Sequence, residues 1–159
     1  QVCDGDTSGI LIVHSLSKSF NAAGYRAAFI AGDPSLIAQV REIRKHLGLI
    51  MPAPIQHAMA AALAHPEDIA IQKERYRARR QMLATALTAA GLEISESQAG
   101  LYLWATRSED CWSTVAWAAE RGVLVTPGEF YGEKGSNFVR IALTASDVDI
   151  ARAAERFHS

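Results

Sequence analysis

The chain has 159 residues, of which 49% are apolar, and its 16 basic and 17 acidic side chains give a formal net charge of −1. This length is sufficient for a domain with its own core. The balanced charge lacks the basic surface that binds nucleic acid or an anionic membrane, so neither partner is expected. No apolar stretch approaches the ~18 residues of a membrane-spanning helix, and the acidic first residues do not form a secretory signal.

The cysteines and histidines argue for a reduced compartment and against a metal site. Cys3 and Cys111 are far apart in sequence, and neither has a ligand-like neighbour. Two free thiols in a reducing cytosol fit this pattern, although a single disulfide between them stays open. The five histidines show no spacing typical of metal ligands. We therefore expect a cytoplasmic protein without a metal.

The first part of the chain reads as alternating strands and helices. The apolar run at 10–13 favours a strand that is buried on both faces, as in a parallel sheet. A second strand is predicted at 25–31. Asp33 followed by proline is a typical helix start and predicts a helix over 34–47, and a helix rich in small residues is expected over 55–64. This order indicates an α/β architecture.

The second part changes to short strands and helices after a long helix. That helix is predicted from residue 65 to about residue 90, and its charged run at 73–80 is interpreted as a solvated face. The pattern beyond it is typical of a separate small α+β layer. Strands are expected at 92–94, 101–105, 123–125 and 138–144, and helices at 114–121 and from the Ser146-Asp147 cap to residue 157.

Directly after the first strand, Ser15, Ser17, Lys18 and Arg26 form a group with recognisable chemistry. A lysine amine has an ordinary pKa of ~10.4, and burial or a neighbouring cation lowers it enough for attack on a carbonyl. The two serine hydroxyls and the forked guanidinium of Arg26 are donors that suit a phosphate. Together these functions suggest pyridoxal phosphate held on Lys18 as a Schiff base.

Two other interpretations of this group lack the companion motifs that they need. A Ser-x-x-Lys pair also occurs in serine acyl-transfer enzymes, where Ser15 would be the nucleophile and Lys18 its base. The companion motifs Ser-Asp-Asn and Lys-Thr-Gly are missing from the sequence. A phosphate-binding P-loop would need Gly-x-x-x-x-Gly before Lys18, which is also missing.

The residues from Ser15 to Asp33 closely resemble the cofactor-lysine segment of class I/II aminotransferases, which are fold-type I pyridoxal phosphate enzymes. Three further stretches resemble this family in the same order. Residues 99–104 resemble a small-domain strand at the substrate entrance, 126–132 the turn before the last active-site segment, and 138–144 the strand whose arginine binds the substrate α-carboxylate. The resemblance covers nearly the whole chain.

The resemblance implies a fold and a set of site residues. It implies the end of the large cofactor-binding α/β domain over 1–65, a connecting helix over 66–91 and a small C-terminal α+β domain over 92–159. In this interpretation Lys18 is the catalytic lysine that binds the cofactor and moves the proton. Ser15, Arg26 and Ser17 hold its phosphate. The rest of the pocket, with the Asp that pairs with the cofactor's ring nitrogen, is expected upstream of this chain.

Arg140 is the residue that the resemblance assigns to the substrate carboxylate. It lies between Val139 and Ile141 in an apolar strand, where an unpaired guanidinium would be costly. A bidentate carboxylate would satisfy it. The residue patterns alone leave two alternatives open, a solvent-facing side chain or a structural ion pair with an Asp or Glu.

Within the family, residues 100–106 and 111–117 are most similar to N-succinyldiaminopimelate aminotransferases of lysine biosynthesis. The expected reaction transfers an amino group from N-succinyl-diaminopimelate to 2-oxoglutarate, in a homodimer. The alternatives are an aspartate- or alanine-type aminotransferase, a carbon–sulfur β-lyase of the same fold, and a non-catalytic aminotransferase-like regulatory domain.

Overall fold

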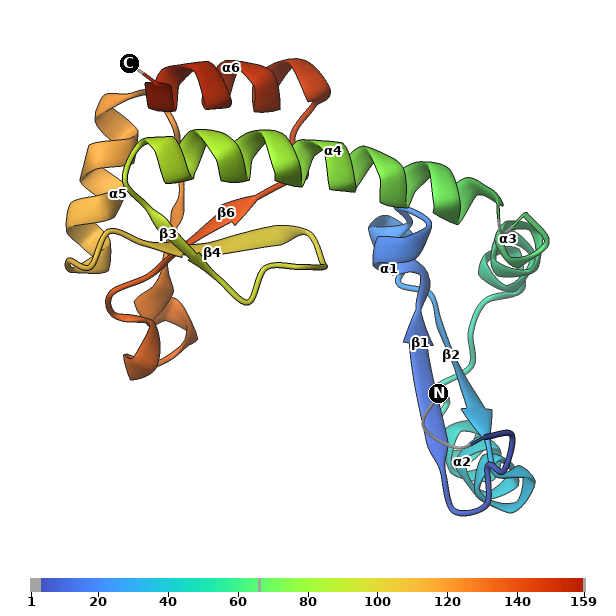
Figure 1. Ribbon diagram of the computed structural model, residues 1–159. Helices are drawn as coiled ribbons and strands as arrows, with labels where there is room; N and C mark the ends of the chain where they lie inside the picture. The colour runs from blue at the N-terminus through green and yellow to red at the C-terminus, as the bar shows by residue number, and fades with distance from the viewer. Residues whose placement is uncertain (1–3, 66, 159) are drawn as a thin grey trace. The chain divides into compact units, whose positions relative to one another are not determined.

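A computed structural model describes residues 4–65 and 67–158, and it divides into two compact units at residues 1–73 and 74–159 (Figure 1). The predictions for Cys3 and for the start of the long helix at Pro66 fall outside the described residues. Each unit has its own set of strands, and each is described by itself. The order of elements agrees with the expected α/β segment followed by a small α+β segment.

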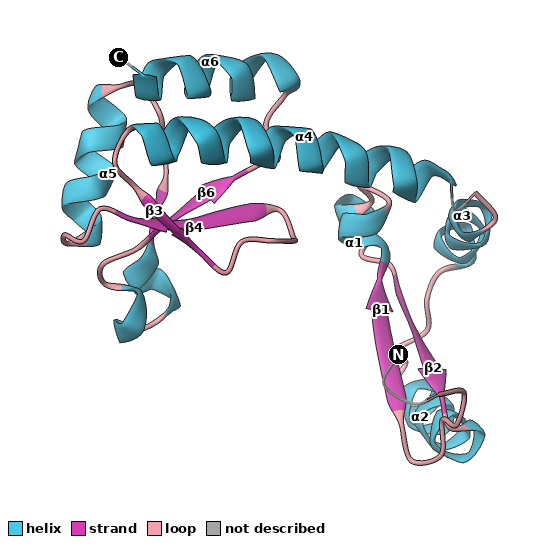
Figure 2. Cartoon of the chain, in the orientation of Figure 1, coloured by secondary structure: helices cyan, strands magenta, loops and turns pink. Residues whose placement is uncertain are grey.

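The first unit contains two paired strands joined by a short helical connection (Figure 2). Strand β1 (Leu11–Ser15) pairs antiparallel with β2 (Ala28–Gly32). The connection holds α1 (Leu16–Ser19) and the 3-10 turn η1 (Ala23–Tyr25). This turn takes up the first residues of the strand predicted at 25–31, so β2 begins three residues later than expected.

The predicted burial of the first strand is wrong for this chain. Every residue of β1 is exposed, and the Val13 side chain reaches 70% exposure. The pairing is antiparallel with β2, its one strand neighbour in the described part of the chain, instead of parallel within a larger sheet. The apolar composition correctly indicated a strand, but burial also needs covering elements, and the described residues supply none for β1.

Helix α2 (Pro34–His46) agrees with the helix predicted over 34–47, and its start is stabilised by Asp33. One carboxylate oxygen of Asp33 accepts from the backbone N–H groups of Ser35 (2.7 Å) and Leu36 (3.3 Å). The other accepts from the N–H of Gly9 at 2.8 Å. The Gly9 bond comes first among the causes that lower the pKa of Asp33 from its ordinary 3.8 to about 2. The carboxylate thus links the chain before β1 to the start of α2.

We expect Asp33→Asn to remove part of the acid sensitivity of the protein. A carboxyl whose pKa is lowered on folding contributes stability above its ordinary pKa, and this stability is lost as the pH falls from about 4 towards about 2. Asparagine still caps a helix, but its single carbonyl oxygen cannot serve both Gly9 and the helix start. Unfolding midpoints measured between pH 2 and 7 should fall less steeply below pH 4 in the variant. Identical slopes in the two proteins would contradict this account of Asp33.

Helix α3 (Ala53–Leu63) lies where a helix of small residues was predicted, and α4 (Glu67–Ala89) follows it. Most of the charged run in α4 is exposed, as predicted for a solvated face. Arg79 departs from this pattern because its side chain is only 11% exposed. Its Nε donates to a carboxylate oxygen of Asp147 at 2.6 Å, and its Nη1 donates to the Leu143 carbonyl at 3.0 Å. Arg79 therefore ties α4 to the start of the last helix.

The second unit is built on an antiparallel four-stranded sheet with the order β3-β4-β6-β5. Trp104 lies opposite Arg140 on the central pair of strands, and Thr126 lies opposite Arg140 on the edge. The strand predicted over 123–125 is wrong, because those residues are irregular and the pairing starts at Thr126. The strands are β3 (Glu93–Ser95), β4 (Tyr102–Thr106), β5 (Thr126–Pro127) and β6 (Val139–Ala142).

One face of this sheet carries the core of the unit. Helices α5 (Cys111–Glu120) and α6 (Asp147–His158) pack with the second part of α4 against it (Figure 1). The alternation of β4 and β6 sends every second side chain into this core. On the opposite face, Tyr102, Trp104 and Arg140 are half-buried. The buried core includes Leu83, Leu87, Leu103, Ala105, Val139, Ile141, Ile150 and Phe157.

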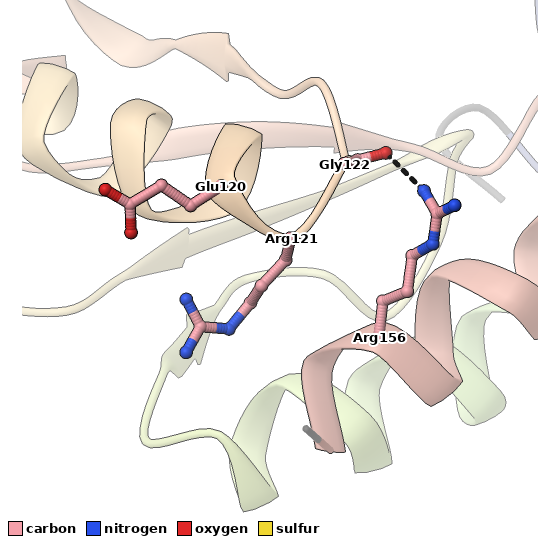
Figure 3. A pocket seen from close by; sticks show the side chains of 4 residues that line it. All are labelled: Glu120, Arg121, Gly122 and Arg156. Carbon is pink, nitrogen blue, oxygen red and sulfur yellow. Dashed lines mark hydrogen bonds between the residues drawn. The ribbon is translucent and has the colours of Figure 1, made fainter.

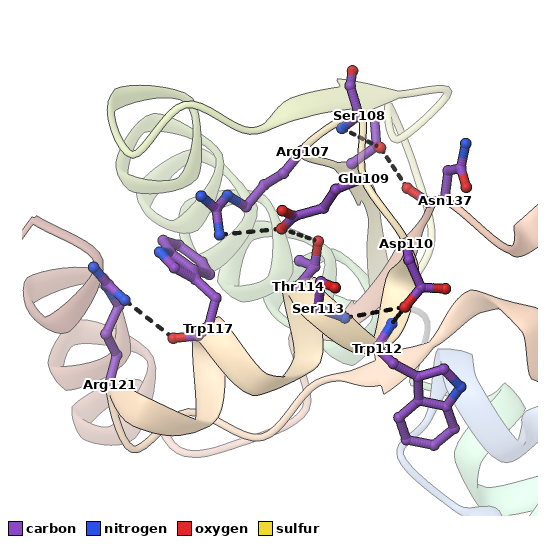
Figure 4. Close-up of polar contacts among 11 residues, drawn as sticks. Arg107, Ser108, Glu109, Asp110, Trp112, Ser113, Thr114, Trp117, Arg121 and Asn137 are labelled. Carbon is purple, nitrogen blue, oxygen red and sulfur yellow. Dashed lines mark hydrogen bonds and ion pairs between the residues drawn. The ribbon is translucent and has the colours of Figure 1, made fainter.

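The start of α5 is held by a group of polar contacts (Figure 4). The carboxylate of Asp110 accepts from the N–H groups of Trp112 (2.9 Å) and Ser113 (3.2 Å). The Thr114 hydroxyl donates to Glu109 at 2.9 Å, and Glu109 pairs with Arg107 at 3.2 Å. These contacts stabilise the first turn of α5. The helix begins at Cys111, three residues before the predicted start at residue 114.

Three further findings concern a cysteine, membrane-spanning helices and metal ligands. Cys111 is a free, buried thiol in the first turn of α5. Within 4–65 and 67–158, no helix is both long enough and apolar enough to cross a membrane. The same ranges contain no group of three His, Cys, Asp or Glu side chains that could hold a metal ion.

Candidate functional site

The two serines of the predicted cofactor segment lie side by side at the end of β1. The Ser15 hydroxyl donates to the Ser17 hydroxyl at 2.9 Å, and the Ser17 N–H donates to Ser15 Oγ at 3.2 Å. Ser15 is also the N-cap of α1, so its side chain is held at the turn between strand and helix. Leu16, between them, is 1% exposed and anchors this turn. The sequence thus brings two hydroxyls to one point.

Lys18 lies one residue beyond this pair, in the last turn of α1. Its side chain is exposed and makes no hydrogen bond or ion pair with any residue in the part of the chain that the structure describes. The amine is therefore not engaged by a structural partner. A lysine that serves as a nucleophile needs this freedom.

Arg26 is placed near this turn by the backbone of the first unit. The N–H of Leu16 donates to the Ala27 carbonyl at 3.0 Å, which brings α1 next to the residue that follows Arg26. Arg26 itself adopts a left-handed backbone conformation with φ of 53°. Its Nη1 donates to the Ala23 carbonyl at 3.1 Å, and its side chain makes no hydrogen bond to either serine. The remaining guanidinium N–H groups are not used by this bond.

These four residues fit the phosphate and the aldehyde of pyridoxal phosphate by the chemistry of their donors. Ser15, Ser17 and Arg26 provide hydroxyl and guanidinium donors, and none of them pairs with a carboxylate among the described residues. Phosphate oxygens are acceptors only, so a donor set of this kind matches them. The unengaged amine of Lys18 is the group that an aldehyde requires.

Arg140 lies in the second unit, on the half-buried face of the sheet. Its Nη2 donates to the Thr126 hydroxyl at 3.5 Å, which is a long contact. Its Nε is buried and has no acceptor, and no carboxylate pairs with it in the described part of the chain. The alternative of a structural ion pair finds no support among these residues, and the half-buried position argues against a purely solvent-facing role. A buried N–H without an acceptor is costly, and Arg80 Nε on α4 is in the same condition.

Aromatic side chains surround Arg140 on this face. Its guanidinium carbon lies 4.3 Å from the ring centre of Tyr102 and 5.2 Å from that of Tyr131. Trp104 stacks on Phe138, with ring centres 5.4 Å apart, and meets Tyr131 edge to face at 5.9 Å. Sequence reasoning assigned no role in the site to Tyr102, Trp104 and Tyr131 and missed this arrangement. The alternation around Leu103 was the available signal, because it places Tyr102 and Trp104 on one face.

The turn predicted at 126–132 closes this aromatic cluster. It forms β5 and the 3-10 turn η2 (Gly128–Tyr131). Gly128 is buried, and a side chain at this position would clash with the backbone carbonyl oxygens of Gly135 and Phe138 and begin 2.8 Å from the Trp104 ring. Glycine is therefore required here so that the turn can bring Tyr131 up to Arg140.

A separate hollow lies at the end of α5, and none of the predicted site residues lines it (Figure 3). Glu120, Arg121, Gly122 and Arg156 line it. Arg156 donates to the Gly122 carbonyl at 2.7 Å, and Arg121 donates to the Trp117 carbonyl at 3.1 Å. Both arginines thus bind carbonyls at the end of this helix, which is a structural function.

The family model described as aminotransferase class I and II matches residues 2–157. The chain belongs to the class I and II aminotransferase family. Enzymes of this family generally use pyridoxal phosphate.

Individual relatives of this aminotransferase chain agree with the family. It is 53% identical over 155 residues to a probable aminotransferase of Mycobacterium tuberculosis. The matched residues cover 98% of this chain and 37% of the relative. It is 52% identical, with 98% and 43% coverage, to the 4-dedimethylamino-4-oxo-anhydrotetracycline transaminase of Streptomyces rimosus. A solved structure of a probable N-succinyldiaminopimelate aminotransferase from Thermus thermophilus superposes with a TM-score of 0.81 at 30% identity. The superposition covers 97% of this chain and 42% of that structure's chain.

The aminotransferase chain spans about two fifths of the length of these relatives. The residues that match the family therefore include only part of a complete family member. The exposed apolar strand β1 is consistent with this, because a strand of this composition is typical of a sheet covered on both faces.

Proposed function

We propose that this chain carries the cofactor lysine and the substrate arginine of a pyridoxal phosphate-dependent aminotransferase, which transfers an amino group between an amino acid and a 2-oxo acid. The observation that carries this proposal is the guanidinium of Arg140, which is half-buried and has a buried Nε without an acceptor. Amino acids and 2-oxo acids share an α-carboxylate, and a carboxylate is the bidentate partner that a guanidinium fork fits best. The family match supplies the reaction class.

Each predicted residue then has a distinct function. Pyridoxal phosphate, when bound, supplies an electron sink for the negative charge that develops at the substrate α-carbon. Ser15, Ser17 and Arg26 bind its phosphate through hydroxyl and guanidinium donors. Lys18 Nζ would hold the cofactor before substrate arrives, and its amine would move the proton from the substrate α-carbon. Arg140 orients the substrate through its carboxylate.

The same proposal assigns the parts of the chain to domains. We propose that residues 1–65 complete a large cofactor-binding domain, that 66–91 are a connecting helix and that 92–159 form the small domain. The protein is proposed to act as a homodimer, as is usual in this family. Both statements are proposals, because the chain spans about two fifths of the length of its relatives.

For the substrate we propose N-succinyl-diaminopimelate, with 2-oxoglutarate as the acceptor in lysine biosynthesis. Two similar proteins support a diaminopimelate-type donor: the probable N-succinyldiaminopimelate aminotransferase of Thermus thermophilus and the LL-diaminopimelate aminotransferase of Dehalococcoides mccartyi, which is 35% identical over 144 residues. A second candidate is the amination of a polycyclic ketone. The 52% identity to the Streptomyces rimosus transaminase favours it.

A panel of amino donors tests this function in the natural protein loaded with pyridoxal phosphate. Glutamate formed from 2-oxoglutarate is measured with N-succinyl-LL-diaminopimelate, LL-diaminopimelate, aspartate and alanine. We expect kcat/KM for the succinylated donor to exceed the others at least about tenfold, a difference of about 1.4 kcal/mol in transition-state binding. A higher kcat/KM for aspartate or alanine would contradict the proposal that N-succinyl-diaminopimelate is the amino donor. Pyruvate and ammonia from cystathionine would indicate the β-lyase, and no reaction with any donor would indicate a regulatory domain.

A further inference from the structure

The environment of Arg140 contains one feature that the proposed function does not use, the ring of Tyr102. Arg140 on β6 lies opposite Trp104 on β4. Tyr102 is two residues before Trp104 on β4, so it is the diagonal cross-strand neighbour of Arg140 on the same face of the sheet. Its ring centre is 4.3 Å from the guanidinium carbon, closer than the 5.2 Å of Tyr131. Both distances lie within the ~6 Å range of cation–π attraction.

The ring of Tyr102 lies close enough to the Arg140 guanidinium for cation–π attraction. The N–H groups of a guanidinium point outward along the edges of one plane, so hydrogen-bond acceptors approach at these edges. Arg140 Nε is buried and has no acceptor. Among the described residues, the one side-chain acceptor for the other N–H groups is the Thr126 hydroxyl at 3.5 Å. The tyrosine ring therefore stabilises a cation that has few hydrogen-bond partners of its own.

We propose that Tyr102 is a positioning residue for substrate binding, which holds the Arg140 guanidinium in place for the substrate carboxylate. This inference rests on the proposed function, because it assumes that Arg140 binds that carboxylate. Tyr102 acts through Arg140 and through the face of its ring. An arginine side chain loses rotamer entropy when it is fixed by a ligand, and a guanidinium that is already oriented loses less of it on binding.

Tyr102→Leu and Tyr102→Phe test the proposal in the natural protein loaded with pyridoxal phosphate. Leucine removes the aromatic face, so KM for the amino donor and for 2-oxoglutarate should rise about tenfold, within the range of cation–π energies, while kcat changes little. Phenylalanine keeps the face and should restore KM to within about twofold of the wild type. Calorimetric titration with glutarate, which binds but cannot react, should show the same order of dissociation constants.

Tyr76→Leu is the matched control, because Tyr76 also lies under an arginine, with the Arg79 guanidinium carbon 5.5 Å from its ring centre. It should leave KM and glutarate affinity unchanged. If Tyr102→Leu does not fold, as judged by thermal unfolding, Tyr102→Met takes its place with the same expectation.

Three results would overturn the inference. Unchanged KM and glutarate affinity in Tyr102→Leu would show that the ring does not position Arg140. Equal losses in Tyr102→Phe and Tyr102→Leu would assign the effect to the hydroxyl instead of the ring face. A wild-type protein that neither binds glutarate nor transfers an amino group would overturn the proposed function, and the positioning role would fall with it.

Discussion

Replacing Lys18 with alanine should reduce amino transfer by about 1000-fold or more, because the amine that holds the cofactor and moves the proton is removed. The phosphate donors Ser15, Ser17 and Arg26 remain, so the variant should still bind pyridoxal phosphate without a covalent link. The measurement is the rate of glutamate formation together with the amount of cofactor retained after gel filtration. Lys18→Arg keeps the positive charge but provides no amine, and it should be equally impaired.

Lys45→Ala is the control for this experiment. Lys45 is an exposed lysine near the end of α2, with an ion pair to Glu42 at 3.6 Å. Its loss should leave amino transfer within about twofold, as expected for an exposed surface pair. A Lys18→Ala protein that kept a tenth or more of the wild-type rate would show that another group performs the reaction.

Arg140→Ala should raise KM for both the amino donor and 2-oxoglutarate by about 100-fold, since truncating one partner of a buried charged hydrogen-bond pair costs about 2–5 kcal/mol. Both substrates carry the α-carboxylate, so both should be affected. Arg140→Lys keeps the charge but loses the fork, and it should recover only part of the affinity. Steady-state kinetics at varied concentrations of each substrate measure these effects.

Two comparisons make the Arg140 result specific. The visible absorbance of bound cofactor should be unchanged in Arg140→Ala, because this residue is assigned to the substrate. Arg121→Ala, which removes a guanidinium that lies 4.4 Å from the Trp117 ring centre, should leave both KM values unchanged. Loss of cofactor with unchanged KM would assign Arg140 to the cofactor and contradict the proposal.

Much of the fold could be predicted because short sequence patterns, such as helix caps, determine where its helices begin. Asp33 before a proline predicted the start of α2, and Ser146 accepts from the Asp149 N–H at 3.1 Å, as expected for the cap of the last helix. These signals act over a few residues, so sequence order is sufficient to read them. The irregular 123–125 stretch was mistaken for a strand because its composition is typical of one, while pairing with β6 decides where β5 begins.

The site shows the same division between local and long-range information. The hydrogen-bonded pair of Ser15 and Ser17 follows from neighbouring residues and was predicted as a group with Lys18. The ring of Tyr102 near Arg140 depends on the register between β4 and β6, which are more than thirty residues apart. Composition cannot specify such a register. The residues that surround the arginine therefore became visible only in the folded sheet.

Reductive trapping tests the central claim most directly. The natural protein is loaded with pyridoxal phosphate, reduced with borohydride, digested and analysed by mass spectrometry. The chain contains four lysines, so Lys45, Lys73 and Lys134 are internal controls. We predict that the mass of the reduced cofactor appears on the peptide that contains Lys18 and on none of these three. A label on another lysine, with Lys18 unmodified, would contradict the assignment of Lys18 as the cofactor lysine.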